Sequence, residues 1–124
     1  EGVNLNEMLT AMNKKIEVLY DREHTIGHSF FMGLTNDSKI EDLAEVFKQD
    51  IIPLLKEYFY DEYERIAEVL GDDLNSKSET NFIIRQDDSY ANIRNTELVT
   101  ITAYEFNDSA FKNVEAYQKI YKKL

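Results

Sequence analysis

NKKIEVLYDREHTIGHSFFM, residues 13–32, is the stretch around which we expect the chain to fold. Its first part predicts a helix, because apolar residues recur at the helical spacing of i, i+3 and i+4: Ile16, Leu19 and Tyr20. Charged and titratable residues then occupy positions 21–24, Gly27 interrupts the pattern, and an apolar run closes the stretch at positions 30–32. We therefore expect a turn that presents polar groups and is held between two helices.

The size and composition of the chain bound its class. With 124 residues and 43% hydrophobic residues, it has enough apolar side chains for one core, so we predict a single domain over residues 1–124. No run of about 18 apolar residues is present, so we expect no membrane span. The absence of cysteine excludes disulfides and thiolate metal sites and favours a cytoplasmic protein. The chain begins Glu-Gly-Val without Met or an apolar leader, so we expect a piece of a longer protein without a secretion signal.

The charge balance argues against direct nucleic-acid binding. The formal net charge is −10, and phosphate backbones bind proteins through Lys and Arg. The lysines near the C-terminus are interpreted as the solvated face of a terminal helix rather than as a nucleic-acid patch. We therefore expect any contact with DNA to be made by other parts of a larger assembly.

Apolar periodicity predicts a first helix over residues 5–20, capped by Asn4 with Glu7 three residues later. One stripe of this helix is apolar: Leu5, Met8, Leu9, Met12, Ile16 and Leu19. A short helix is expected over residues 28–34, followed by a turn at positions 33–37.

A third helix is predicted after a capping box at Ser38–Glu41. Its inward residues are Ile40, Leu43, Ala44, Phe47 and Ile51. Pro53 either kinks this helix or stands in the first turn of the next. That next helix is predicted over residues 54–70, with Gly71 at its C-terminus.

The remainder of the chain is expected to be mixed. A polar loop at 72–80 precedes two extended segments, 81–85 and 97–106, which a polar connection at 86–96 joins into a hairpin. A final helix, capped by Asp108 or Ser109, follows with one apolar side: Ala110, Val114, Tyr117 and Tyr121. The predicted fold class is mainly α (α+β), a bundle of four to five helices with a small antiparallel β-hairpin.

Motifs of common enzymes are missing. The sequence has no GxxxxGK[ST] phosphate loop and no GxGxxG, and Ser29 has no GxSxG setting. His24 and His28 form an HxxxH spacing that holds Zn²⁺ on an unbroken helix, but Thr25 replaces the usual Glu and Gly27 lies inside the motif. Three interpretations stay open: a metal site, a structural or surface pair, and a turn that faces a ligand.

Other charged and aromatic residues also have two interpretations. Arg22 either pairs with a carboxylate of Glu17, Asp21 or Glu23, or is directed at phosphate, whose oxygens a guanidinium matches. Four carboxylates are interpreted as a solvated helix face rather than acid–base machinery: Asp61, Glu62, Glu64 and Glu68. Three tyrosines are expected to pack at the core and its rim rather than to stack on bases: Tyr58, Tyr60 and Tyr63.

Two long blocks of the sequence resemble a known family. LYDREHTIGHSFFMGL at 19–34 and VFKQDIIPLLKEYFYDEYERIAEVLGD at 46–72 resemble the C-terminal part of McrB-type proteins, the AAA+ GTPase subunits of methylation-dependent restriction systems. AYQKIY at 116–121 is similar to the family's tail, and residues 75–106 only to its general layout. The chain departs from the family pattern at Lys15, Tyr20, Glu23, Phe30 and Asp50.

The resemblance implies the α-helical lid of an AAA+ motor, without the nucleotide-binding core. In such motors the nucleotide lies between core and lid, so the residues implied to bind it are those that match the motif: Arg22, His24, Gly27, His28 and Ser29. The resemblance implies that the full-length parent binds GTP (or ATP) with Mg²⁺ and that this chain alone does not. We expect no catalytic or metal-binding residue in this chain. The implied partners are the chain's own AAA+ core, neighbouring subunits of a hexameric ring, and an endonuclease subunit in phage defence.

Two alternatives from other classes remain. The chain is either a free-standing acidic helical protein-interaction module or, through His24 and His28, a metal hydrolase. A phosphate loop upstream in the same reading frame would favour the lid, and an initiator Met just before Glu1 the interaction module. Stoichiometric Zn²⁺ would favour the hydrolase.

Overall fold

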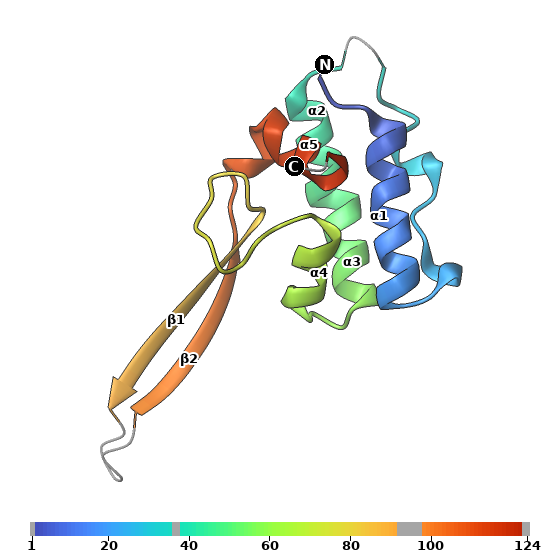
Figure 1. Ribbon diagram of the computed structural model, residues 1–124. Coiled ribbons are helices and arrows are strands. Elements are labelled where there is room, and N and C mark those ends of the chain that lie inside the picture. Colours follow the sequence, from blue (N-terminus) through green and yellow to red (C-terminus); the bar gives the residue numbers. More distant parts are fainter. Residues whose placement is uncertain (1, 36–37, 92–97, 123–124) are drawn as a thin grey trace.

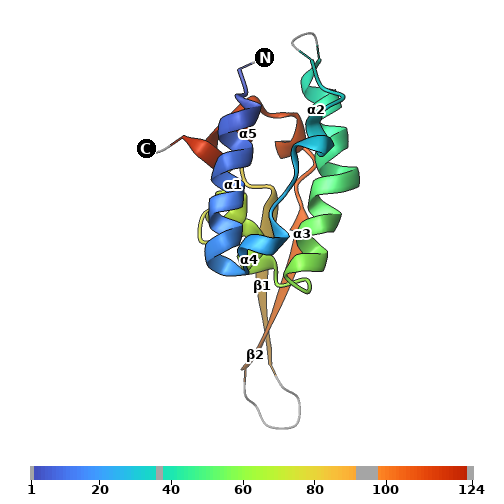
Figure 2. The same cartoon turned by 90° about the vertical axis from the view of Figure 1, so that its right-hand side faces the viewer.

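Two helical rods stand opposite each other in this protein, the shorter helices pack against them, and the hairpin extends away from the helices (Figures 1 and 2). The structure is a computed structural model that describes residues 2–35, 38–91 and 98–122. One rod is α1 (Leu5–Leu19), and the other joins α2 (Ile40–Val46), a π-helical turn η3 (Phe47–Ile51) and α3 (Ile52–Tyr58) end to end. The predicted class, mainly α with a small antiparallel hairpin, is confirmed. None of the helices among the described residues is long and apolar enough to cross a membrane.

The first rod forms as its sequence pattern predicts. Four residues of the apolar stripe are buried: Met8, Leu9, Met12 and Ile16. The Asn4 side chain caps the helix by accepting a hydrogen bond from the backbone N–H of Glu7, at 3.1 Å. The reciprocal half of the expected capping box is absent, because the backbone N–H of Asn4 instead donates to the hydroxyl of Tyr121, at 2.9 Å. This bond ties the start of α1 to the end of the chain.

The second rod begins one residue later than predicted. Lys39, not Ser38, is the N-cap, and its backbone N–H donates to the Asp42 carboxylate at 2.8 Å. Pro53 stands in the first turn of α3, which is one of the two expected positions. The rod stays continuous there because the π-helical turn just before Pro53 widens the backbone, which absorbs the missing N–H and the bulk of the ring.

The helix expected over residues 54–70 is wrong, because the structure divides it. α3 ends at Tyr58, and α4 (Tyr63–Val69) begins after a turn in which Tyr60 and Asp61 have φ angles of 50° and 60°. The backbone N–H of Asp61 donates to the carbonyl of Lys56 at 2.9 Å, closing α3 in a Schellman motif. Apolar spacing continues across the turn, and no glycine marks it, so the periodicity concealed the break.

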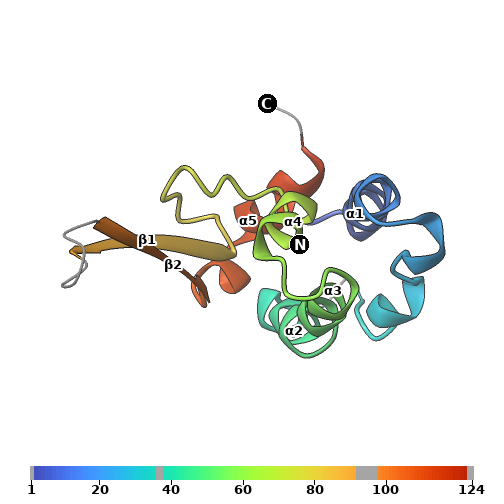
Figure 3. The ribbon, with the colours of Figure 1, turned by 90° about the horizontal axis from the view of Figure 1, so that it is seen from below.

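The hairpin is longer than predicted and projects away from the helices (Figures 1 and 3). β1 (Ile83–Ala91) pairs with β2 (Leu98–Phe106) in antiparallel register, from Ile83 opposite Phe106 to Ala91 opposite Leu98. Residues 86–91, expected in the connection, are therefore strand. Residues 92–96 of that connection lie outside the described part of the chain.

The last helix also begins later than predicted. A 3₁₀ turn, η4 (Ala110–Lys112), comes first and is followed by α5 (Val114–Tyr121). Neither Asp108 nor Ser109 caps α5; Asn113 does, since its side chain accepts from the backbone N–H of Glu115 at 2.9 Å.

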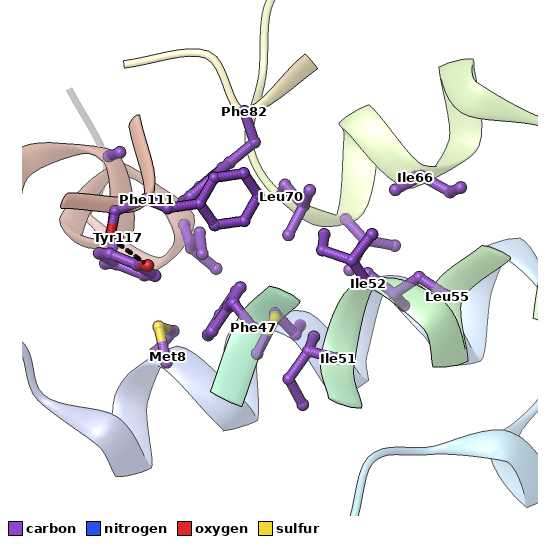
Figure 4. Packing of buried hydrophobic residues seen from close by; sticks show 14 of the residues in the cluster. Met8, Phe47, Ile51, Ile52, Leu55, Ile66, Leu70, Phe82, Phe111 and Tyr117 are labelled. Carbon is purple, nitrogen blue, oxygen red and sulfur yellow. Dashed lines mark hydrogen bonds between the residues drawn. The ribbon is translucent and has the colours of Figure 1, made fainter. Parts of the chain in front are cut away.

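An aromatic cluster at the centre of the core joins the second rod to the hairpin and to α5 (Figure 4). Ring centroids lie 4.9 Å apart for Phe47 and Tyr117, and 5.1 Å apart for Phe82 and Phe111. The buried Tyr117 hydroxyl donates to the carbonyl of Phe111 at 2.7 Å, and burial raises the Tyr117 pKa. Since Phe82 directly precedes β1, the base of the hairpin is part of the core.

A buried ion pair also stabilises the junction between the base of the hairpin and the helices. The Asp72 carboxylate accepts the backbone N–H groups of Phe82 and Ile83, at 3.0 and 2.8 Å, and lies 2.8 Å from the Lys119 ammonium. The ammonium also lies over the Phe82 ring, 4.3 Å from its centroid. Burial raises the pKa of Asp72 and lowers that of Lys119, against the mutual attraction of the two charges. The pair links the end of α4, the start of β1 and α5.

Candidate functional site

The segment between α1 and α2 carries every residue expected to bind nucleotide. It leaves α1 through a 3₁₀ turn, η1 (Arg22–His24), crosses the space between the two rods, and forms a second 3₁₀ turn, η2 (His28–Phe31) (Figure 2). The helix expected over 28–34 is thus only a four-residue 3₁₀ turn. Because so short a turn has little helix dipole, contacts with a ligand at this turn would depend chiefly on its side chains.

Two anchors hold this segment against the rods. The Asn13 side chain donates to the carbonyl of Ile26 at 3.0 Å and accepts the N–H of Ile26 at 2.6 Å, while the Ile26 side chain is buried. The buried Phe31 ring packs near Phe47, with centroids 6.3 Å apart. Of the four residues between these anchors, Phe30 is half-buried and the other three are exposed: Gly27, His28 and Ser29. The fold therefore presents them on a short bridge fixed at both ends.

Asp21 and His24 shape the first turn. One oxygen of Asp21, Oδ1, accepts the backbone N–H of Glu23 at 2.8 Å and lies 2.6 Å from Nδ1 of His24. The hydrogen bond with His24 is the main reason that the pKa of the Asp21 carboxyl lies below its usual value. The His24 ring packs between two tyrosines, 4.4 Å from the centroid of Tyr20 and 5.2 Å from that of Tyr58. His24 thus connects the end of α1 to the end of α3.

The five candidate residues lie at the surface, but they are not gathered at one point. Arg22 is exposed at η1, and Gly27, His28 and Ser29 are exposed at the start of η2. The His24 side chain is 41% exposed. Among the described residues, no carboxylate lies within salt-bridge distance of Arg22, so the ion pair offered as its structural explanation is not formed in this structure.

The two histidines differ in their surroundings. His24 is held by Asp21 and the tyrosine rings, whereas His28 is exposed on the far side of the Ile26 anchor. Within the part of the chain that the structure describes, no three His, Cys, Asp or Glu side chains lie close enough together to hold a metal ion.

The carboxylates and tyrosines of α3 and α4 only partly follow expectation. All four carboxylates are exposed as predicted: Asp61, Glu62, Glu64 and Glu68. Tyr63 packs on Tyr104, with centroids 5.2 Å apart, and Tyr58 is half-buried. Tyr60 is different, because 79% of it is exposed, so its expected packing is wrong.

Several residues that hold the site were not singled out from the sequence. Arg65 donates to the carbonyl of Leu19 at 2.9 Å and thereby ties α4 to the end of α1. Lys15 reaches the carbonyl of Glu68 at 3.0 Å, so this departure from the family pattern contacts α4. Asn13 gave one usable signal, since asparagine inside a helix often bonds to backbone elsewhere.

Comparison with known proteins places the chain in a family. Residues 4–67 match the family described as McrB, alpha-helical lid domain. No curated protein and no solved structure matches the chain. The matched region runs from the cap of α1 into α4 and contains the whole segment with both 3₁₀ turns; the hairpin and α5 lie beyond it. The match covers just over half of the sequence, and the chain belongs to the McrB α-helical lid domain family.

Proposed function

We propose that this chain is the C-terminal lid of an McrB-like AAA+ motor, which hydrolyses GTP (or ATP) and drives DNA translocation in methylation-dependent restriction. The family match over residues 4–67 carries this proposal. On this proposal the 124 residues act as one domain, and the nucleotide lies between the lid and the core of the parent protein.

The exposed bridge is the part of the lid that we propose to face the nucleotide. Its support is geometric: Gly27, His28 and Ser29 stand out between two buried anchors. A Cβ added at Gly27 would have only the Ser29 hydroxyl near it, at 3.8 Å, so the lid itself does not need a glycine there. We infer that the glycine leaves room for something outside the lid.

The charged residues of η1 have two different roles in this proposal. Arg22 is exposed and free of carboxylate partners among the described residues, so its planar guanidinium is available to phosphate oxygens. His24 is held by Asp21 and the tyrosine rings, so it chiefly positions the turn and offers the nucleotide only its exposed edge.

Partners follow from the same proposal. The lid would move on its own AAA+ core and against the neighbouring ring subunit, while an endonuclease subunit cuts DNA and other parts of the parent hold it. Rigid-body motion of the lid is supported by the core, because buried residues of both rods, the hairpin base and α5 belong to one hydrophobic cluster (Figure 4).

The test uses the full-length parent protein. Arg22→Ala and His28→Ala should each lower GTP turnover at least about tenfold, as expected when a charge-assisted contact worth about 1.5–3 kcal/mol is lost. Lys112→Ala, an exposed substitution on η4, is the matched control and should leave turnover unchanged. Turnover at the wild-type rate, with normal ring assembly, in both test variants would remove the site assignment.

The purified chain should not hydrolyse GTP. Its sequence has no GxxxxGK[ST] loop to cradle the phosphates, so Mg²⁺ and the triphosphate would be held chiefly by the parent's core. Phosphate release assayed with the chain alone should equal that of buffer. Turnover that survives repurification and disappears in His28→Ala would contradict the lid proposal.

A further inference from the structure

α1 and α3 end at the same end of the two rods (Figure 2), and three tyrosines stand at or just after these helix ends: Tyr20, Tyr58 and Tyr60. The "tyrosine patch" is defined here as five residues: Tyr20, Asp21, Glu57, Tyr58 and Tyr60. Tyr20 and Tyr58 have ring centroids 6.0 Å apart, and Tyr20 is 37% exposed. Partial burial, together with the nearby Tyr60 and Asp21, raises the pKa of Tyr20, so these side chains influence one another.

Tyr60 is the unusual member of the patch. Its ring is 79% exposed although its backbone has a φ of 50°, a conformation that disfavours side chains other than glycine and asparagine. A large ring at such a position adds backbone strain while burying little surface in its own fold. Strain of this kind persists where another requirement selects the side chain. Within its own fold Tyr60 helps to raise the pKa of Tyr20, but most of the residue stays exposed, so we look outside the chain for a contact that buries it.

The charged groups of the tyrosine patch determine which kind of ligand it can bind. Oδ1 of Asp21 is engaged by Glu23 and His24, whereas Oδ2 has no hydrogen-bond partner among the described residues. Glu57 is exposed beside Tyr58; burial is the main reason that the pKa of Tyr58 is raised, and the charges of Glu57 and Asp21 raise it further. Two carboxylates beside three electron-rich rings repel phosphate and attract a cation.

We propose that the tyrosine patch binds an arginine side chain presented by a partner protein. The planar guanidinium stacks on the tyrosine faces, and one of its N–H groups donates to Oδ2 of Asp21. Glu57 adds attraction at the rim. The patch adjoins the proposed nucleotide site at His24, which bonds to Asp21 and packs against Tyr20 and Tyr58, but it contains none of the bridge residues Gly27–Ser29.

The experiment is an NMR titration of the chain with acetyl-Gly-Arg-Gly-amide. The matched probe is the same peptide with citrulline, which keeps the shape of arginine but carries no charge. The arginine peptide should shift the ring resonances of Tyr20, Tyr58 and Tyr60, and the citrulline peptide should not.

Variants then separate binding from folding. Tyr60→Gly suits the backbone at that position and should keep the fold while weakening arginine binding about two- to fivefold, the usual range for one exposed cation–π contact. Glu57→Gln removes a charge from the rim and should weaken it less. Glu79→Gln, which removes an exposed carboxylate from the loop before β1, should have no effect.

Three results would overturn the proposal. Equal shifts with both peptides would show that charge plays no part. Shifts confined to residues outside the patch would place the binding elsewhere. Shifts of the three tyrosine rings by GTP, with none by the arginine peptide, would make the patch a nucleobase surface instead.

Discussion

At the scale of single residues, the hydrogen bond between Asp21 and His24 decides the shape of the first turn. His24→Ala should raise the pKa of the Asp21 carboxyl toward 3.8, because this bond is the largest cause of its lowered value. The measurement is a pH titration of the Asp21 carboxyl ¹³C resonance. His28→Ala removes the other histidine and should leave the titration unchanged; a shift in that variant, or none in His24→Ala, would contradict the assignment.

The lowered pKa of Asp21 also determines how this carboxyl changes the folding stability with pH. Between the folded value and 3.8, the unfolded chain binds more protons at Asp21 than the folded chain does. The stabilisation is therefore fully present above 3.8 and is lost as the pH falls through the lower, folded-state pKa. Since Asp21 is solvent-exposed, we expect its influence on global unfolding to be small and local to η1.

At the scale of residues, the sequence predicts some features of the candidate site and not others. The polar residues around Gly27 correctly indicated an exposed turn, because a surface helix needs neither a glycine nor two histidines there. Asn13 inside a helix indicates a hydrogen bond to backbone elsewhere, but its partner Ile26 was not predictable, since that contact depends on how the chain returns along α1. Whether Arg22 forms an ion pair depends likewise on where the fold places its guanidinium and the neighbouring carboxylates.

At the scale of elements, the turn between α3 and α4 is the sharpest departure from expectation. Apolar spacing locates helices through their buried faces, and that spacing runs unbroken from Leu54 to Leu70. The backbone reverses at Tyr60 and Asp61 only because a Schellman motif closes α3, without the glycine that usually signals one. The hairpin shows a related limit: the polar residues 86–91 look like a connection until they pair with β2.

That turn gives an element-scale prediction. Tyr60→Gly should raise the free energy of unfolding by about 0.5–1 kcal/mol, because glycine adopts a φ of 50° without the penalty that a Cβ brings, less its greater entropy when unfolded. Glu57→Gly, three residues earlier within α3, is the matched control and should lower it by about 1 kcal/mol. Urea unfolding followed by circular dichroism measures both. A loss of stability in Tyr60→Gly would mean that its ring packs on the fold after all.

At the scale of the whole molecule, the projecting hairpin depends on one junction with the helices. Two-stranded hairpins are marginal by themselves, so β1 and β2 must draw stability from their base. Phe82 supplies part of it as a member of the aromatic cluster, and Asp72 supplies another part by accepting the N–H groups of Phe82 and Ile83. Tyr63 of α4, which stacks on Tyr104 of β2, adds a third contact. The family match ends at residue 67, before Asp72 and Phe82, so the contacts of this junction are known only from the structure.

The ion pair at this junction should behave as one unit. Asp72→Asn should lower the free energy of unfolding by about 3 kcal/mol, because it leaves the Lys119 ammonium largely buried without its counter-charge, and an amide cannot accept both backbone N–H groups. Lys119→Met should cost less, since the carboxylate keeps those two hydrogen bonds. The double variant should lose less than the sum of the two single losses, by about 1 kcal/mol or more, because neither charge is then left alone. Urea unfolding of the four proteins measures this, with the hairpin followed by NMR at Ile83 and Phe106. Strictly additive losses, or a hairpin that keeps its register in Asp72→Asn, would contradict the role of the ion pair at this junction.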